Sequence, residues 1–193
     1  NAVPHMMVVK NRTGVSRQWS VYHRSITSSQ NGGVYLNLTN AWNADSTLFN
    51  NTAPTSSQFT VGTYYSAVSE TIIAYLWSEI EGFSKFSSYT GNASTDGPFV
   101  WCGFRPRFVM LKDVTNVAYW VMIDTVRNTV NVVSDELLAN TANAENGLAI
   151  TTAIDCTANG FKIRTSDANL NQSGDSYIFA AFAENPFKYA RAR

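Results

Sequence analysis

The sequence predicts an all-β protein: an antiparallel β-sandwich built from two tandem repeats with pseudo-two-fold symmetry and at most short helical turns. Motifs recur in the same order about a hundred residues apart, Gly- and Asn-containing turns separate short apolar or alternating segments, and helix signals are weak. We assign the first β repeat to residues 1–87, a connector to 88–103 and the second β repeat to 104–193. A single repeat would bury little apolar surface, so we expect the two to pack as one sandwich.

A strand that follows a proline opens each repeat. Residues 4–11 (PHMMVVKN) and 106–113 (PRFVMLKD) share the proline, an apolar run, a lysine and a final amide or acid. A tryptophan follows in each repeat, Trp19 in the first and Trp120 in the second. Large and polar residues alternate from Trp19 to His23, which is the period of a half-buried strand.

The later segments of the two repeats also match in order. The matching pairs are residues 36–41 with 137–142, 58–61 with 160–163, and 71–79 (TIIAYLWSE) with 176–184 (SYIFAAFAE). The closing segments, 71–79 and 176–184, are apolar on both faces, so we expect both at the centre of a sheet. Turn chemistry precedes several strands, as at Asn159-Gly160, because Asn and Gly tolerate positive φ.

Helical and irregular segments are expected in three places. Residues 135–146 (DELLANTANAEN) follow Ser134, a candidate N-cap, and predict one short helix or helical turn, with a counterpart near 39–45. Residues 84–98 are rich in Ser, Gly, Thr and Asn and predict a connector, which aromatic side chains pin to the surface of the fold.

Composition excludes several classes of function. Fourteen basic and fourteen acidic residues cancel, so nucleic-acid binding has no electrostatic basis. No stretch approaches the ~20 apolar residues that span a bilayer, and we expect no membrane insertion. The chain opens at Asn1 directly before an apolar strand without a signal peptide, and we expect the natural polypeptide to continue upstream.

Metal, cofactor and nucleophile motifs are not found. His5 and His23 lie in predicted strands away from metal-ligand spacing, which favours surface or half-buried strand residues. Residues 167–175 alternate oxygen-bearing side chains but lack the glycine and closing glutamate of a calcium loop, so a polar β-turn is expected. Cys102 and Cys156 are interpreted as buried thiols, with a single bridge left open. We expect neither a metal nor a cofactor.

Carboxylates are scattered along the chain. The candidate acids are Glu70, Glu79, Glu81, Asp124, Glu136 and Glu184. Glu79 and Glu184 occupy matching positions of the two repeats, which favours an architectural role. We therefore predict no catalytic residues and no enzyme activity. The enzymatic alternative is a glycan depolymerase, which needs two facing carboxylates ~5–9 Å apart.

Aromatic side chains are the candidate binding residues. Trp19 and Trp120 match between the repeats and are expected in the core. Four other rings lie in loop-like, polar stretches and are predicted to bind ligand: Trp42, Tyr64, Tyr65 and Tyr89. Exposed rings stack on sugars or anchor protein partners, although packing would explain each ring singly.

Several motifs carry a family resemblance. They are residues 42–43, 50–57, 82–92 (GFSKFSSYTGN), 96–100 with 103–106, 124–128, 159–162 and, most specific, 180–190 (AAFAENPFKYA). These motifs resemble a C-terminal domain of tail-fibre and other virion proteins of tailed bacteriophages. The two cysteines depart from the usual family pattern. The resemblance implies a virion component, often distal and involved in host attachment, and it carries over no catalytic residues.

A bacteriophage virion structural protein is the function predicted from the resemblance, the duplicated β architecture and the neutral surface. It would be a tail-fibre or surface-appendage module on the extracellular particle that binds a host cell-surface glycan or protein non-covalently. Contacts with other virion proteins and a homotrimer are expected, because multivalency multiplies weak sugar affinities. The alternatives are a purely structural capsid decoration or connector protein and the glycan depolymerase.

Overall fold

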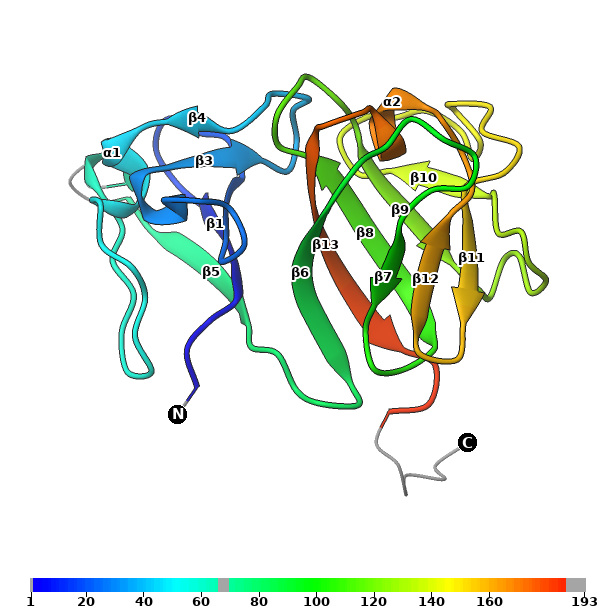
Figure 1. Cartoon of the computed structure of the whole chain (residues 1–193). Helices are drawn as coiled ribbons and strands as arrows, with labels where there is room; N and C mark the ends of the chain where they lie inside the picture. Colours follow the sequence, from blue (N-terminus) through cyan, green and yellow to red (C-terminus); the bar gives the residue numbers. More distant parts are fainter. Residues whose placement is uncertain (1, 66–69, 187–193) are drawn as a thin grey trace.

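Three antiparallel sheets make up the computed structural model, which describes residues 2–65 and 70–186 (Figure 1). The first sheet contains β1 (Met6–Asn11), β2 (Ser20–His23), β3 (Gly32–Tyr35), β4 (Asn43–Ala44) and β5 (Ile72–Trp77), in the order β4-β3-β2-β1-β5. The second contains β6 (Ser84–Thr90), β8 (Pro106–Asp113), β9 (Trp120–Asp124), β10 (Glu136–Leu138) and β13 (Ser176–Ala183), in the order β10-β9-β8-β13-β6. The third contains β7 (Phe99–Trp101), β11 (Ile154–Thr157) and β12 (Gly160–Ile163), in the order β11-β12-β7.

Helical structure is limited to single turns. The α-helices are α1 (Ser46–Phe49) and α2 (Ala168–Asn171), and the 3-10 turns are η1 (Ser29–Asn31) and η2 (Thr63–Tyr65). Among the described residues no helix has the length and apolar character needed to cross a membrane. The predicted all-β sandwich with short helical turns is confirmed.

The second sheet is the middle layer of the molecule (Figure 1). Along β13, Tyr177, Phe179 and Ala181 pack into the core shared with the third sheet. The alternate residues Ile178 and Ala180 pack into the core shared with the first sheet. Because side chains alternate between the faces of a strand, this one strand contributes to two cores at once.

Strand order and register agree between the two halves of the chain. The order β3-β2-β1-β5 in the first sheet corresponds to β10-β9-β8-β13 in the second. Met6 lies opposite His23 and Trp77, and Phe108 lies opposite Asp124 and Phe182. These pairings are those that a duplication predicts, whereas a pseudo-two-fold relation of the halves in space stays a prediction.

Equivalent side chains also make equivalent hydrogen bonds. Lys10 Nζ donates to the carbonyl of Arg17 at 2.8 Å, and Lys112 Nζ donates to the carbonyl of Ala118 at 2.9 Å.

One sequence match shifts by two residues in the structure. The N–H of Leu36 donates to the carbonyl of Trp19, and the N–H of Ala139 donates to that of Trp120. Leu36 therefore corresponds to Ala139 rather than to Leu137. The physical reason is a longer loop between the second and third strands of the second half.

The closing strands of the halves differ in position. β13 lies between β8 and β6, as predicted for a segment that is apolar on both faces. β5 lies at the edge of its sheet, with Tyr75 and Leu76 exposed, so the predicted central position was wrong for this strand.

The connector predicted over 88–103 is instead part of the second half. It contains the end of β6, which pairs with β13, and the whole of β7, which pairs with β12. Ser and Thr suggested a loop, but β6 buries Phe86 on one face, in the core with the first sheet, and Tyr89 on the other, in the core with the third sheet. Because side chains alternate between the two faces of a strand, this segment contributes to both cores and is a strand of the middle sheet rather than a surface connector.

The helix predicted over 135–146 is not formed. Glu136–Leu138 instead forms β10, with Glu136 opposite Ile123 of β9. Glu136 and Leu138 are both buried, and pairing with β9 outweighs the local helix propensity. The counterpart expected near 39–45 corresponds to α1, which begins directly after its N-cap Asp45, whereas α2 begins after its N-cap Asp167.

Candidate functional site

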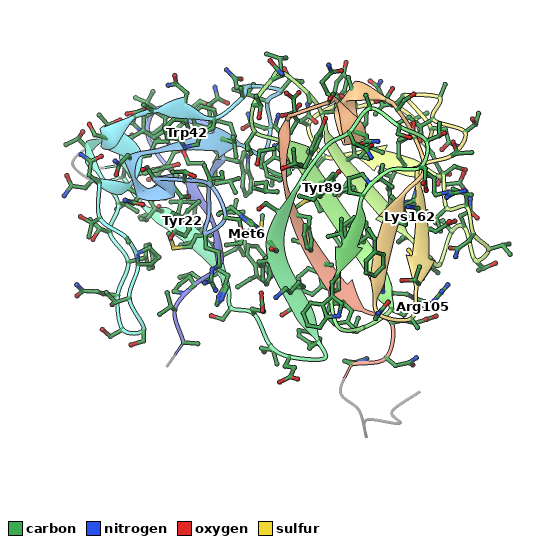
Figure 2. All side chains as sticks on the ribbon, in the orientation of Figure 1. Met6, Tyr22, Trp42, Tyr89, Arg105 and Lys162 are labelled. Atoms are coloured by element: carbon green, nitrogen blue, oxygen red, sulfur yellow. The ribbon has the colours of Figure 1, made fainter. Side chains whose placement is uncertain are left out.

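Two of the predicted binding residues, Tyr65 and Tyr89, are core residues. Tyr65 is buried, and its hydroxyl donates to Ser20 Oγ at 2.6 Å. Tyr89 lies inside the molecule, stacked on Tyr177 at 5.0 Å between ring centroids, and its hydroxyl donates to the carbonyl of Leu170 at 2.6 Å (Figure 2). Neither ring offers a face to a ligand, so the predicted role was wrong for both.

The other two predicted residues, Trp42 and Tyr64, are partly buried. Tyr64 packs beside Tyr65 and under the guanidinium of Arg17, whose Cζ lies 4.9 Å from the ring centroid. Trp42 packs against the core between the first and second sheets and lines a surface pocket of about 400 Å³. Its indole Nε1 is buried without a hydrogen-bond partner among the described residues, so it cannot donate to a ligand in that pocket.

Exposed aromatic rings instead lie on β7. Phe99 is 48% exposed and Trp101 is 59% exposed, while Val100 between them is buried in the core. Since side chains alternate along a strand, both rings project from the outer face of the third sheet. The sequence signal is the alternation Phe-Val-Trp, which the assignment of this segment to a connector concealed.

Two contacts hold the Trp101 indole in place. Lys85 Nζ lies 5.4 Å from its ring centroid, which is a cation–π contact. Gly103 lies against the benzo edge of the indole: a Cβ there would approach Cζ2 to 3.1 Å, and φ is +82°. The ring is therefore ordered although most of its surface faces solvent.

A partly exposed ion pair forms the polar wall beside the indole. Glu79 Oε1 lies 2.8 Å from Lys85 Nζ, and Glu79 Oε2 accepts the backbone N–H of Phe86 at 3.3 Å. Burial raises the pKa of Glu79, but the hydrogen bonds from Lys85 and Phe86 outweigh it, so the net pKa is lowered. Glu79 is consequently an ionised hydrogen-bond acceptor rather than a general acid.

The turn between β5 and β6 completes the site. The N–H groups of Phe83 and Ser84 both donate to the carbonyl of Ile80, and Gly82 has a φ of +73°. This turn presents Glu81 to solvent beside Trp101. A surface pocket of about 270 Å³ results, and we call it the Trp101 pocket; its lining is Glu79, Glu81, Gly82, Ser84, Lys85, Trp101, Cys102 and Gly103.

The Trp101 pocket has the chemistry of non-covalent recognition. An aromatic face packs against apolar C–H groups, while the carboxylates of Glu79 and Glu81 accept hydrogen bonds from hydroxyl groups. Cys102 in the floor is buried, and burial raises its pKa to about 12, so the thiol is neutral and a poor nucleophile.

The remaining cysteine and histidine side chains are structural. Cys156 is also buried and free, so the interpretation of both cysteines as buried thiols is confirmed, and no bridge joins them. His23 is fully buried rather than half-buried, while His5 is partly exposed directly before β1. Within residues 2–65 and 70–186, no three His, Cys, Asp or Glu side chains cluster as a metal site.

Most of the candidate acids engage neighbouring groups. Glu184 Oε2 lies 2.9 Å from Arg105 Nε, which matches the Glu79–Lys85 pair at the end of the equivalent strand. The others are accounted for as follows: Glu70 pairs with Arg17, Asp124 pairs with Arg127, and buried Glu136 accepts the N–H of Leu148. Residues 167–175 contain α2 and, after it, a turn at Ser173-Gly174, where the N–H of Asp175 donates to the carbonyl of Gln172 at 3.3 Å.

Comparison with known proteins identifies one family that matches the chain. A family model described as "Domain of unknown function (DUF7483)" matches residues 1–186, which is nearly the whole chain. No curated protein and no solved structure shows significant similarity to the chain. The last four residues of the 180–190 motif lie outside the described part of the structure. From the extent of the family match we conclude that the chain belongs to the DUF7483 family.

Proposed function

We propose that the chain is a bacteriophage virion module, in a tail fibre or surface appendage, that attaches the particle to its host by binding a surface glycan in the Trp101 pocket. The observation that carries this proposal is the ordered, exposed indole of Trp101 beside the Glu79–Lys85 ion pair. Phe99 and Trp101 expose two rings on the same face of β7, and neighbouring exposed apolar side chains mark interaction sites more often than a single exposed ring does. The virion location rests on the sequence resemblance.

The surface around the pocket suits a neutral ligand with many hydroxyl groups. Lys85 is neutralised by Glu79, and the whole chain has no net charge. Such a surface gives little long-range attraction to phosphates or polyanions. Recognition would depend on ring stacking and short-range hydrogen bonds, which select a saccharide over an ionic polymer.

Binding of the labelled chain to a glycan array and to host cells tests the proposal. We expect Trp101→Ala to weaken glycan binding at least tenfold, since each tenfold change corresponds to about 1.4 kcal/mol. Leu137→Ala, an exposed side chain on the distant β10, is the matched control and should bind like the parent chain. Full binding by Trp101→Ala would rule out this pocket, and no binding by the parent chain would rule out glycan attachment.

A second experiment, incubation of the chain with polysaccharide, separates attachment from the depolymerase alternative. Polysaccharide incubated with the chain should keep its length, because Glu79 is ionised by its partners and cannot donate a proton to a leaving group. Shortened polysaccharide would favour the enzyme.

A further inference from the structure

The outer edge of β5 is an open, apolar sheet edge. β5 pairs with β1 on one side, and no described strand pairs with its other side. Its sequence, IIAYLW, contains no charged residue and no proline. Tyr75 is 43% exposed and Leu76 is 44% exposed. Proteins usually protect such an edge with a charge, a proline or a bulge, because it offers a template for another strand.

The backbone groups on this edge can be identified from the pairing with β1. The carbonyls of Thr71 and Trp77 accept hydrogen bonds from the N–H groups of Arg12 and His5, on the β1 side. Antiparallel pairing alternates, so Ile73 and Tyr75 face β1 in the same way. Ile72, Ala74 and Leu76 therefore direct their N–H and C=O groups away from the sheet.

The second half of the chain shows what covers the equivalent edge. β13 corresponds to β5 by strand order and register, and β6 pairs with its outer edge in antiparallel orientation over seven residue pairs. The first half has no described strand in the place of β6. The fold thus leaves one antiparallel strand missing beside β5.

We propose that a second copy of this chain fills that place, with the β5 strands of the two copies paired antiparallel about a two-fold axis. Centring the axis on Ala74 pairs all three residues whose backbone groups face outward, Ile72, Ala74 and Leu76. Ile72 of one copy then lies opposite Leu76 of the other, and Ile73 lies opposite Tyr75. Apolar side chains meet apolar side chains at every position, and no like charges are opposed.

The composition of this edge favours a second copy over a foreign strand. The edge carries no charge that would select a partner of opposite sign, whereas antiparallel pairing of identical strands is self-complementary and closed. The other edge strands are less suited to pairing with a second copy. β4, β7, β10 and β11 have only two to four residues, and β6 carries the charged Lys85. Pairing would join the two first sheets into one ten-stranded sheet.

A single pair of six-residue strands makes a small interface, so the dimer should dissociate on dilution. Sedimentation velocity over a concentration series of the whole chain measures this. We expect reversible conversion from monomer to dimer, and a shift of the midpoint to at least tenfold higher concentration for Leu76→Lys, which places a charge on the apolar edge. Leu137→Lys is the control, because Leu137 is an exposed leucine on β10, the edge strand of a different sheet.

Hydrogen exchange supplies a readout that is specific to the strand pair. On raising the concentration, the amides of Ile72, Ala74 and Leu76 should exchange at least tenfold more slowly, while those of Ile73 and Tyr75 stay protected by β1 throughout. If Leu76→Lys fails to fold, Tyr75→Lys replaces it on the other face of the strand. A chain that stays monomeric, forms trimers, or dimerises without slowing these three amides overturns the proposal. None of these outcomes depends on glycan binding.

Discussion

His23 lies between the first and second sheets with both ring nitrogens engaged. Its Nε2 donates to the carbonyl of Phe179 at 3.1 Å, and its Nδ1 accepts the N–H of Ser25 at 3.3 Å. Only the neutral ring can make both hydrogen bonds. Burial lowers the pKa of His23 to about 4, since a charged imidazole would lose its hydration there.

Acid should therefore destabilise the protein through His23. Its pKa in the folded state lies below the value of 6.5 for the unfolded chain, so its contribution is complete above pH 6.5 and is lost as the pH falls toward 4. At about 1.4 kcal/mol per pKa unit, the loss approaches about 3 kcal/mol. Urea unfolding of the parent chain and of His23→Gln at pH 7 and pH 4 measures it. The parent chain should lose more stability than the variant, and equal losses would contradict the assignment.

Residue types alone did not separate exposed rings from packing rings. Tyr65 and Tyr89 stand in polar stretches, but tertiary contacts bury both. Trp101 stands between a buried valine and a buried cysteine, yet it faces solvent. The exposure of a ring depends on which face of its strand is covered, and that follows from the sheet packing rather than from the neighbouring residues.

At the scale of the element, the close approach of β7 and β12 depends on Gly160. A Cβ at this position would lie 2.1 Å from the carbonyl oxygen of Val100, so no larger residue fits without moving β7. β7 has only three residues and is held in its sheet by β12 alone. Gly160 thereby fixes the position of the strand that carries Trp101.

We expect Gly160→Ala to lower the free energy of unfolding by about 2 kcal/mol through this overlap. Gly174→Ala is the matched control: Gly174 has open space around its Cα but a φ of +82°, so its cost of about 1 kcal/mol is conformational. Urea unfolding gives both values. In addition, Gly160→Ala should weaken glycan binding, whereas Gly174→Ala should not. Normal stability and normal binding of Gly160→Ala would show that β7 does not need this spacing.

Strands that belong to the repeated motifs were predicted better than strands that are found only in the second half of the chain. The elements β1, β2, β8, β9 and β13 fall within segments that the repeated motifs mark as strands. β6 and β7 have no described counterpart in the first half, so no repeat marks them, and the serine and threonine content of β6 resembles that of a loop. β5 is an edge strand for the same reason: the first half has no described strand equivalent to β6, which pairs with β13 and not with β5.

For the molecule as a whole, one core and several backbone contacts join the first and second sheets. The shared core includes Val8 and Val21 of the first sheet and Trp120 and Ile178 of the second. The indole of Trp120 also donates from Nε1 to the carbonyl of Tyr35 at 2.9 Å. The two halves should therefore unfold together.

Trp120→Phe tests this coupling. The variant removes the hydrogen bond to Tyr35 and leaves a small cavity, and we expect it to lower stability by about 2 kcal/mol, or the melting temperature by roughly 5 °C for a chain of this size. Calorimetry should still show a single transition. Trp101→Phe changes an exposed ring and should alter the melting temperature little. Two separate transitions in the parent chain would show that the halves unfold independently.

The central place of β13 has a consequence for how the protein is made. β13 is synthesised after every other described strand, yet it contributes to both cores of the middle sheet. While it is still in the ribosome, the faces that will pack against it stay exposed on the nascent chain. Neither sandwich interface can close before translation has passed residue 183, so the apolar faces of the earlier strands stay exposed to aggregation until then.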